Sequence, residues 1–235
     1  MAIKPPRLLE TLAALVAGAT LTAAASSCNT TALNTTTGLY PISSPGTTIF
    51  DVANATNRGV CDIGRYNLMA DVEILPNVGQ QIVIPPEICE PDNDTCLLPP
   101  PNSSARTCIY GGPRLYYTVN GDTYAAIARR LDITVEALMG NHSAGGETAT
   151  SVLAAGQFVK VPQCDPSQCV TQPFSFTHGV YKDLAEKYGT TVGQIMMLSP
   201  TYNYSQSLAT PGQSPPSIVL PINCTLLAAN YTVLD

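Results

Sequence analysis

Few side chains in this 235-residue chain could carry acid–base or metal chemistry. The two histidines, His142 and His178, are far apart in the sequence, and no hydrolase, zinc-protease or phosphate-loop motif surrounds them. One group of carboxylates, Glu90, Asp92 and Asp94, lies in a segment rich in Pro and Cys, where we expect a solvated loop. A glycoside hydrolase needs two carboxylates on opposite sides of the scissile bond, and no Asp-x-Asp-x-Glu run is present. We therefore expect a non-catalytic protein without a metal or a cofactor.

The cysteines are the remaining reactive groups, and their spacing indicates disulfides rather than zinc. Zinc sites typically use closely spaced Cys pairs, whereas the shortest spacings here leave four residues between Cys164 and Cys169 and six between Cys89 and Cys96. An even number of cysteines in an exported chain favours four disulfides. The predicted disulfide residues are Cys28, Cys61, Cys89, Cys96, Cys108, Cys164, Cys169 and Cys224.

Export is indicated by the N-terminus and by the asparagines. Basic residues, a short apolar stretch and small residues follow one another in residues 1–25, which is the order of a secretory signal peptide. Nine of the 13 asparagines lie in Asn-x-Ser/Thr triplets, whereas the 41 Ser and Thr residues would give about two by chance. We expect a secreted, extracellular glycoprotein. The candidate glycosylation sites are Asn29, Asn34, Asn54, Asn93, Asn102, Asn141, Asn203, Asn223 and Asn230.

The charge and hydropathy patterns exclude two classes of partner. Eleven Lys and Arg residues stand against 17 Asp and Glu residues, for a formal net charge of −6. Nucleic-acid binding relies on clustered basic residues, so we expect no nucleic-acid partner. No apolar stretch reaches the roughly 20 residues that a membrane-spanning helix needs, so we expect no membrane partner.

The elements that position these residues form a repeated pattern, which is clearest in residues 116–162. Good β-formers predict one strand at 116–119 and another at 158–161. Between the strands, the side chains of a Gly-Asp-Thr turn at 121–123 are predicted to cap one helix, and Thr134 is predicted to cap a second. The predicted order is therefore strand, helix, helix, strand.

The first of these helices has an amphipathic pattern. Ile127 and Leu131 are four residues apart and share the face that we expect to be buried. Arg129 and Arg130 are expected to point to solvent.

The same order is predicted in two further stretches, 40–86 and 174–221, with a first strand at 174–176 in the latter. Pro- and Cys-rich joints at 87–107 and 163–173 separate the three stretches and are interpreted as linkers. The predicted fold class is α+β, with three tandem small βααβ modules that short Pro/Cys-rich linkers join and disulfides staple. The placement of the cysteines around these modules favours the pairs Cys108–Cys164 and Cys169–Cys224, with the other four pairing among themselves.

The middle stretch resembles the LysM module. The resemblance rests on Gly121-Asp122-Thr123, Ile127-Ala128, Val135-x-x-Leu138, and Gly156-Gln157 before the closing strand and Pro162. Residues 77–96 also look like the corresponding segment of secreted fungal LysM effectors. The resemblance implies three LysM modules, at 40–86, 116–162 and 174–221, that bind chitin or chitin oligosaccharides. It is weaker in the third module, where His178-Gly179-Val180-Tyr181 replaces the Gly-Asp-Thr turn.

In this family the ligand lies in a shallow groove between the first strand–helix turn and the loop after the second helix. Turn backbone groups can hold the acetamido group there while small apolar side chains contact its methyl. The resemblance therefore implies the following chitin-binding residues: Gly46, Thr47, Thr48, Ile49, Asn67, Leu68, Met69 and Ala70 in the first module; Gly121, Asp122, Thr123, Tyr124, Asn141, His142 and Ser143 in the second; and Gly179, Val180, Tyr181, Ser199, Pro200, Thr201 and Tyr202 in the third.

Each of these assignments has a structural alternative. Asp122 and Thr123 are also explained as helix caps, and Asn67 and Asn141 as partners of loop backbone groups. The apolar members Ile49, Met69 and Tyr124 are equally suited to a core. Since Asn141 also begins a glycosylation triplet, a glycan there would obstruct the middle groove.

The expected function is non-catalytic chitin binding outside the cell. By resemblance, the protein would sequester chitin fragments from host receptors, shield fungal walls from chitinases, or do both, in the host apoplast or at the fungal wall. Two modules, or two chains, could share one oligomer, which would give ligand-bridged self-association. The alternatives are a wall-targeting protein, a structural wall protein with degenerate modules, and a peptidoglycan binder.

Overall fold

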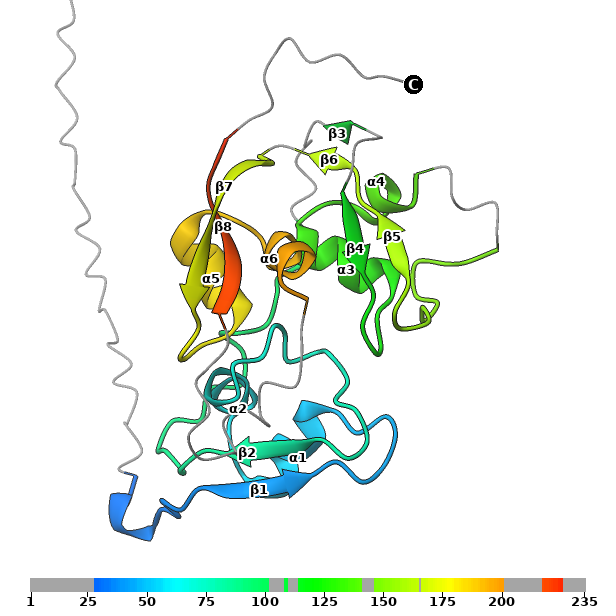
Figure 1. Cartoon of the computed structure of the whole chain (residues 1–235). Coiled ribbons are helices and arrows are strands. Elements are labelled where there is room, and N and C mark those ends of the chain that lie inside the picture. The colour runs from blue at the N-terminus through cyan, green and yellow to red at the C-terminus, as the bar shows by residue number, and fades with distance from the viewer. Residues whose placement is uncertain are drawn as a thin grey trace, which may run out of the picture.

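The computed structural model describes residues 28–101, 108–109, 114–140, 146–164, 166–200 and 217–225. The predicted signal peptide at 1–25 lies outside the described residues. The described chain forms three units of the order strand, helix, helix, strand (Figure 1). The middle and third units lie side by side, and the first unit lies below both of them in this view.

In the first unit, β1 (Gly38–Pro41) pairs with β2 (Gln81–Ile84) in an antiparallel ladder. The helices α1 (Ile49–Thr56) and α2 (Val60–Tyr66) lie between these two strands in the sequence. A single 3-10 turn at Thr30–Ala32 precedes this unit.

In the middle unit, β4 (Leu115–Tyr117) pairs with β5 (Phe158–Lys160), and α3 (Tyr124–Leu131) and α4 (Val135–Met139) lie between them in sequence. Beside this ladder, the short strands β3 (Cys108–Ile109) and β6 (Gln163–Cys164) form a separate pair.

The third unit contains β7 (Gln168–Ser175), α5 (Tyr181–Tyr188), α6 (Val192–Leu198) and β8 (Ser217–Thr225). The interpretation of 163–173 as a linker is wrong for most of that segment, because β6 and the first six residues of β7 fall within it. The local composition does not indicate a strand here, because cross-strand hydrogen bonds to β8 hold this segment extended. The register of the pair places Thr171 opposite Pro221.

Threonine side chains begin four of the six helices described. Thr123 Oγ1 accepts a hydrogen bond from Ala126 N at 3.1 Å, and Thr134 Oγ1 accepts one from Ala137 N at 3.1 Å. Thr48 and Thr191 cap α1 and α6 in capping boxes with the residue three positions later. Asp122 does not cap α3, because its Oδ2 accepts instead from Val119 N at 2.8 Å within the turn.

Two apolar clusters form the core. One belongs to the first unit and receives Val180 from the third unit. The other joins the middle and third units through α3, α6 and β4, and it also takes in Leu68, Ala70 and Ile74 from the first unit. Each unit alone is too small to bury a large core. Because both clusters contain side chains from more than one unit, the three units pack into one body.

Four disulfides reinforce this body. Both pairs favoured by the sequence are present, and the remaining four cysteines pair among themselves. The four pairs are Cys28–Cys89, Cys61–Cys96, Cys108–Cys164 and Cys169–Cys224.

Candidate functional site

The strand–helix turn of the first unit is open to solvent. Gly46 has a φ of +80°, which glycine adopts without strain, and it is exposed, while Thr47 and Thr48 are half-buried. The chain just after β1 contacts the loop that precedes β2, because Gly79 N donates to the carbonyl of Ile42 at 2.8 Å. Val78 in that loop is 57 % exposed. The first unit therefore exposes both polar turn groups and an apolar side chain.

The residues predicted to form the other wall of this groove are buried. Asn67 donates from Nδ2 to the carbonyls of Ile63 and Val83 at 2.8 and 2.7 Å, and its Oδ1 accepts from Val83 N at 2.9 Å. The two hydrogen bonds with Val83 tie the end of α2 to β2. The buried apolar members of the predicted set are Ile49, Leu68, Met69 and Ala70.

The middle unit directs its turn aspartate inward. Asp122 is fully buried and forms an ion pair with Nη1 of Arg130. Nε of Arg130 lies 2.6 Å from Oδ2 of Asp71 in the first unit. The expectation that Arg129 and Arg130 point to solvent is wrong for Arg130, whose exposed fraction is 3 %, and Arg129 pairs with Glu73. The sequence pattern could not show this, because Asp71 and Glu73, which pair with Arg130 and Arg129, come from another unit.

The hydroxyl of Tyr116 completes this buried network. It accepts from Nη1 of Arg130 at 3.1 Å and lies 3.6 Å from the sulfur of Met196 in the third unit. Burial raises the pKa of Tyr116 well above its ordinary value. Side chains from all three units therefore meet at Arg130 and Tyr116.

The remaining described residues of the middle turn are partly accessible. Gly121 has a φ of +85°, and a Cβ built on it would lie 2.8 Å from Cγ of Leu75 in the first unit. Thr123 caps α3, and Tyr124 donates its hydroxyl hydrogen to Oε2 of Glu147 at 2.8 Å. Burial and the Glu147 carboxylate raise the pKa of Tyr124. The predicted partners Asn141, His142 and Ser143 lie outside the described residues.

The corresponding turn of the third unit is packed against the first unit. Gly179, Val180 and Tyr181 are all buried, and Gly179 N donates to the carbonyl of Arg65 at 3.1 Å. The hydroxyl of Tyr181 donates to the carbonyl of Ser199 at 3.2 Å. Pro200 is exposed. Thr201 and Tyr202 lie outside the described residues.

An interaction that sequence reasoning missed holds this turn in place. Arg65 binds Asp183 through two hydrogen bonds, Nε to Oδ2 at 2.9 Å and Nη2 to Oδ1 at 3.0 Å, and its Nη1 lies 2.6 Å from Oδ2 of Asp92. Asp92 is therefore a structural ion-pair partner rather than a member of a freely solvated loop. Burial of Asp183 alone would raise its pKa, but the Arg65 guanidinium and the Val180 amide lower it overall.

The contact between the first and third units leaves a surface pocket of about 420 Å³. Sequence reasoning did not single it out, since its residues come from two units. Tyr66 and Leu39 contribute apolar surface, with 37 and 53 % of their areas exposed. The lining residues are Thr37, Gly38, Leu39, Tyr66, Val83, Thr177 and His178.

The predicted glycosylation sites within the described residues are all exposed, at Asn29, Asn34, Asn54, Asn93 and Asn223. The other four asparagines lie outside those residues. None of the described helices is long and apolar enough to cross a membrane, and no cluster of His, Cys, Asp or Glu in the same residues could hold a metal ion.

Comparison with known proteins identifies the class. The LysM domain model matches residues 116–162, which is the middle unit. The chain is 45 % identical over 207 residues to Secreted LysM effector LysM13 of Penicillium expansum, with 87 % of each chain covered. It is 32 % identical over 182 residues to Secreted LysM effector ECP6 of Passalora fulva, covering 76 % of this chain and 75 % of the relative. This chain belongs to the family of secreted LysM effectors.

Proposed function

We propose that this protein binds chitin oligosaccharides without cleaving them, and that its three βααβ units are LysM modules at 40–86, 116–162 and 174–221. The repeated order of elements supports the modular assignment beyond the middle unit. Family membership supports the ligand class, because the module's resemblance to LysM implies β-1,4-linked N-acetylglucosamine.

The observation that carries the proposal is the open turn of the first unit. The Gly46–Thr48 turn is partly accessible and Val78 in the loop before β2 is exposed, so the first unit offers polar groups for an acetamido group and an apolar side chain for its methyl. In this proposal Asn67, Leu68, Met69 and Ala70 act from beneath, by fixing the loop rather than by touching sugar.

The other two units contribute unequally. Gly121, Thr123 and Tyr124 are the partly accessible residues of the middle turn, and Asn141, His142 and Ser143 are its proposed second wall. The buried Val180 and Tyr181 favour the degenerate-module alternative for the third unit, whose contribution would be Thr177 and His178 in the pocket beside Tyr66. Two surfaces on one rigid body would raise affinity for a long oligomer through effective concentration.

Two biological roles follow from such binding, sequestration of chitin fragments from host receptors and protection of fungal walls from chitinases. Peptidoglycan, which also carries N-acetylglucosamine, and attachment to the wall are the alternatives that a ligand panel separates.

The test is calorimetric titration of the secreted protein with chitin hexamer, cellohexaose and a soluble peptidoglycan fragment. We expect heat of binding with the chitin hexamer and none with cellohexaose, which lacks acetamido groups. Thr47→Ala should weaken the chitin interaction, whereas Ser175→Ala, on the exposed face of β7, should not. Absence of chitin binding at high micromolar protein would overturn the proposal, and a preference for peptidoglycan would favour the alternative.

A further inference from the structure

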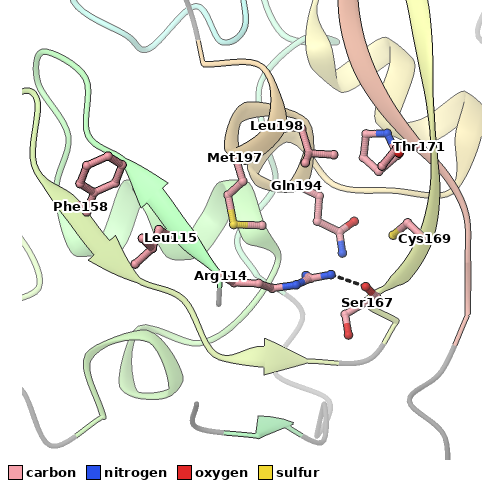
Figure 2. Close-up of a pocket in the computed structure, with 10 residues that line it drawn as sticks. Arg114, Leu115, Phe158, Ser167, Cys169, Thr171, Gln194, Met197 and Leu198 are labelled. Atoms are coloured by element: carbon pink, nitrogen blue, oxygen red, sulfur yellow. Dashed lines mark hydrogen bonds between the residues drawn. The ribbon is translucent and has the colours of Figure 1, made fainter. Parts of the chain in front are cut away.

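A second pocket, of about 440 Å³, lies between the middle and third units and is separate from the proposed chitin surfaces (Figure 2). Its volume falls in the range of small-molecule sites, roughly 300–1,000 Å³. The sheet β4–β5, helix α6 and strand β7 each contribute side chains. The lining residues are Arg114, Leu115, Phe158, Ser167, Cys169, Thr171, Gln194, Met197, Leu198 and Pro221.

Arg114 is the charged residue among those that line this pocket. Its Nη2 donates to the carbonyl of Ser167, the hydrogen bond drawn in Figure 2. No carboxylate within the described ranges pairs with Arg114, in contrast to Arg65 and Arg130. Burial lowers the pKa of Arg114, because a half-buried cation is poorly solvated. A guanidinium has five N–H donors, and among the described residues the Ser167 carbonyl is the acceptor that Arg114 contacts.

Two polar residues of the pocket, Gln194 and Ser167, differ in whether their side chains already form hydrogen bonds. Gln194 is already engaged, since its Nε2 donates to the carbonyl of Pro166 at 3.0 Å and its Oε1 accepts from Thr190 Oγ1 at 2.6 Å. Ser167 is 2 % exposed, and its Oγ has no hydrogen-bond partner within the described part of the chain. An unpartnered buried hydroxyl costs folding free energy, and a ligand that hydrogen-bonds to Ser167 Oγ would offset that cost.

Apart from Thr171, the rest of the pocket is apolar, and several of its side chains are open to water. Leu115, Phe158 and Leu198 are 44, 66 and 43 % exposed, and Met197 lies between the two walls in Figure 2. Large apolar side chains gathered at one place on a surface mark binding sites more often than isolated ones do.

We propose that this pocket binds a small monocarboxylate with an apolar tail. A carboxylate matches the planar guanidinium through paired hydrogen bonds, and the tail would lie on Leu115, Met197 and Leu198. A single cation favours a monoanion over a phosphate or polyanion, which the chain's net charge of −6 would also disfavour. The ligand class differs from uncharged chitin, so the two activities can be measured independently.

The experiment uses octanoate as the probe and octan-1-ol as its uncharged counterpart. Calorimetry and methyl NMR of the full secreted chain would follow both, and the methyl signals of Leu115, Met197 and Leu198 should shift with octanoate. We expect octanoate to bind at least tenfold more tightly than octanol, which corresponds to about 1.4 kcal/mol. Arg114→Gln should abolish that difference, while Lys187→Gln, which removes a distant positive charge on α5, should leave it intact.

A second variant covers the case in which Arg114→Gln does not fold. Leu115→Glu places a carboxylate beside Arg114 at an exposed position and should block octanoate without changing chitin binding. Ile88→Glu, at a position 45 % exposed, is its matched control. Equal binding of octanoate and octanol, no binding of either, or shifts of the same methyls on titration with chitin hexamer would each overturn the proposal.

Discussion

Nε of Arg130 in the middle unit lies 2.6 Å from Oδ2 of Asp71 in the first, and both side chains are 2 % exposed. Asp122 contacts the same guanidinium from within the middle unit, so one buried cation is shared between two carboxylates of different units. The attraction of these carboxylates raises the pKa of Arg130 despite its burial. The first unit therefore packs on the middle one through a buried ion pair, and removing only one partner of such a pair costs much folding free energy.

Asp71→Asn is predicted to destabilise the protein by about 3 kcal/mol. Removing one partner of a buried ion pair typically costs about 3–5 kcal/mol, and the lower end applies because Asp122 still compensates Arg130. Urea unfolding monitored by circular dichroism measures the change. The control, Glu186→Gln, breaks an ion pair with Lys182 at a glutamate side chain that is 66 % exposed, and it should cost about 0.5 kcal/mol or less. Equal effects of the two variants would refute a structural role for the Arg130–Asp71 pair.

The contact between Arg65 and Asp183 predicts a dependence of stability on pH. The pKa of Asp183 is lowered in the folded protein, so its pairing contributes stability above the unfolded value of about 4 and loses it as the pH falls further. The urea midpoint should therefore decrease between about pH 5 and pH 2. Asp183→Asn should be less stable at pH 6 and show a shallower decrease, because it has no proton to take up. An identical slope for the variant and the parent would contradict this assignment.

Asn67 and Thr47 are predicted to affect different quantities. Asn67→Ala removes three buried hydrogen bonds, leaves the peptide groups of Val83 unpaired, and should cost about 3 kcal/mol or more of stability. Thr47→Ala removes a hydroxyl at an accessible turn and should weaken chitin binding with little change in stability. Thermal unfolding and calorimetric titration of both variants test this. If Asn67→Ala stays stable but loses affinity, Asn67 contacts the sugar directly.

Local features of this fold could be predicted from sequence, whereas contacts between units could not. Thr123 and Thr134 were identified as caps because capping depends on residues three positions apart. The order strand, helix, helix, strand of the third unit was predicted correctly because the repeated pattern behind it is local. Arg130 was misplaced because amphipathic periodicity reports polarity and not the presence of a partner such as Asp71, which is 59 positions away.

In the candidate site, too, local features could be predicted from sequence and contacts between units could not. The turn at Gly46 was identifiable from its residue types, and its exposure agrees with an accessible role. The equivalent turn of the third unit has its own local pattern, but only packing shows that Val180 enters the core of the first unit. The pocket at Arg114 had no sequence signal, because its walls are brought together by the packing of α6 against β4.

The disulfide Cys61–Cys96 is predicted to stabilise the protein more than Cys28–Cys89 does. A chain-entropy account favours the opposite order by about 0.5 kcal/mol, because sequence separations of 35 and 61 residues make Cys28–Cys89 the longer loop. However, Cys61 and Cys96 are 0 and 2 % exposed and lie within the first unit's core, while Cys28 and Cys89 are exposed. Replacing the buried pair with alanine therefore adds a cavity of two sulfur atoms to the entropic loss. Urea unfolding of Cys61→Ala/Cys96→Ala and Cys28→Ala/Cys89→Ala measures both, and a larger loss for the exposed pair would show that unfolded-state entropy outweighs packing here.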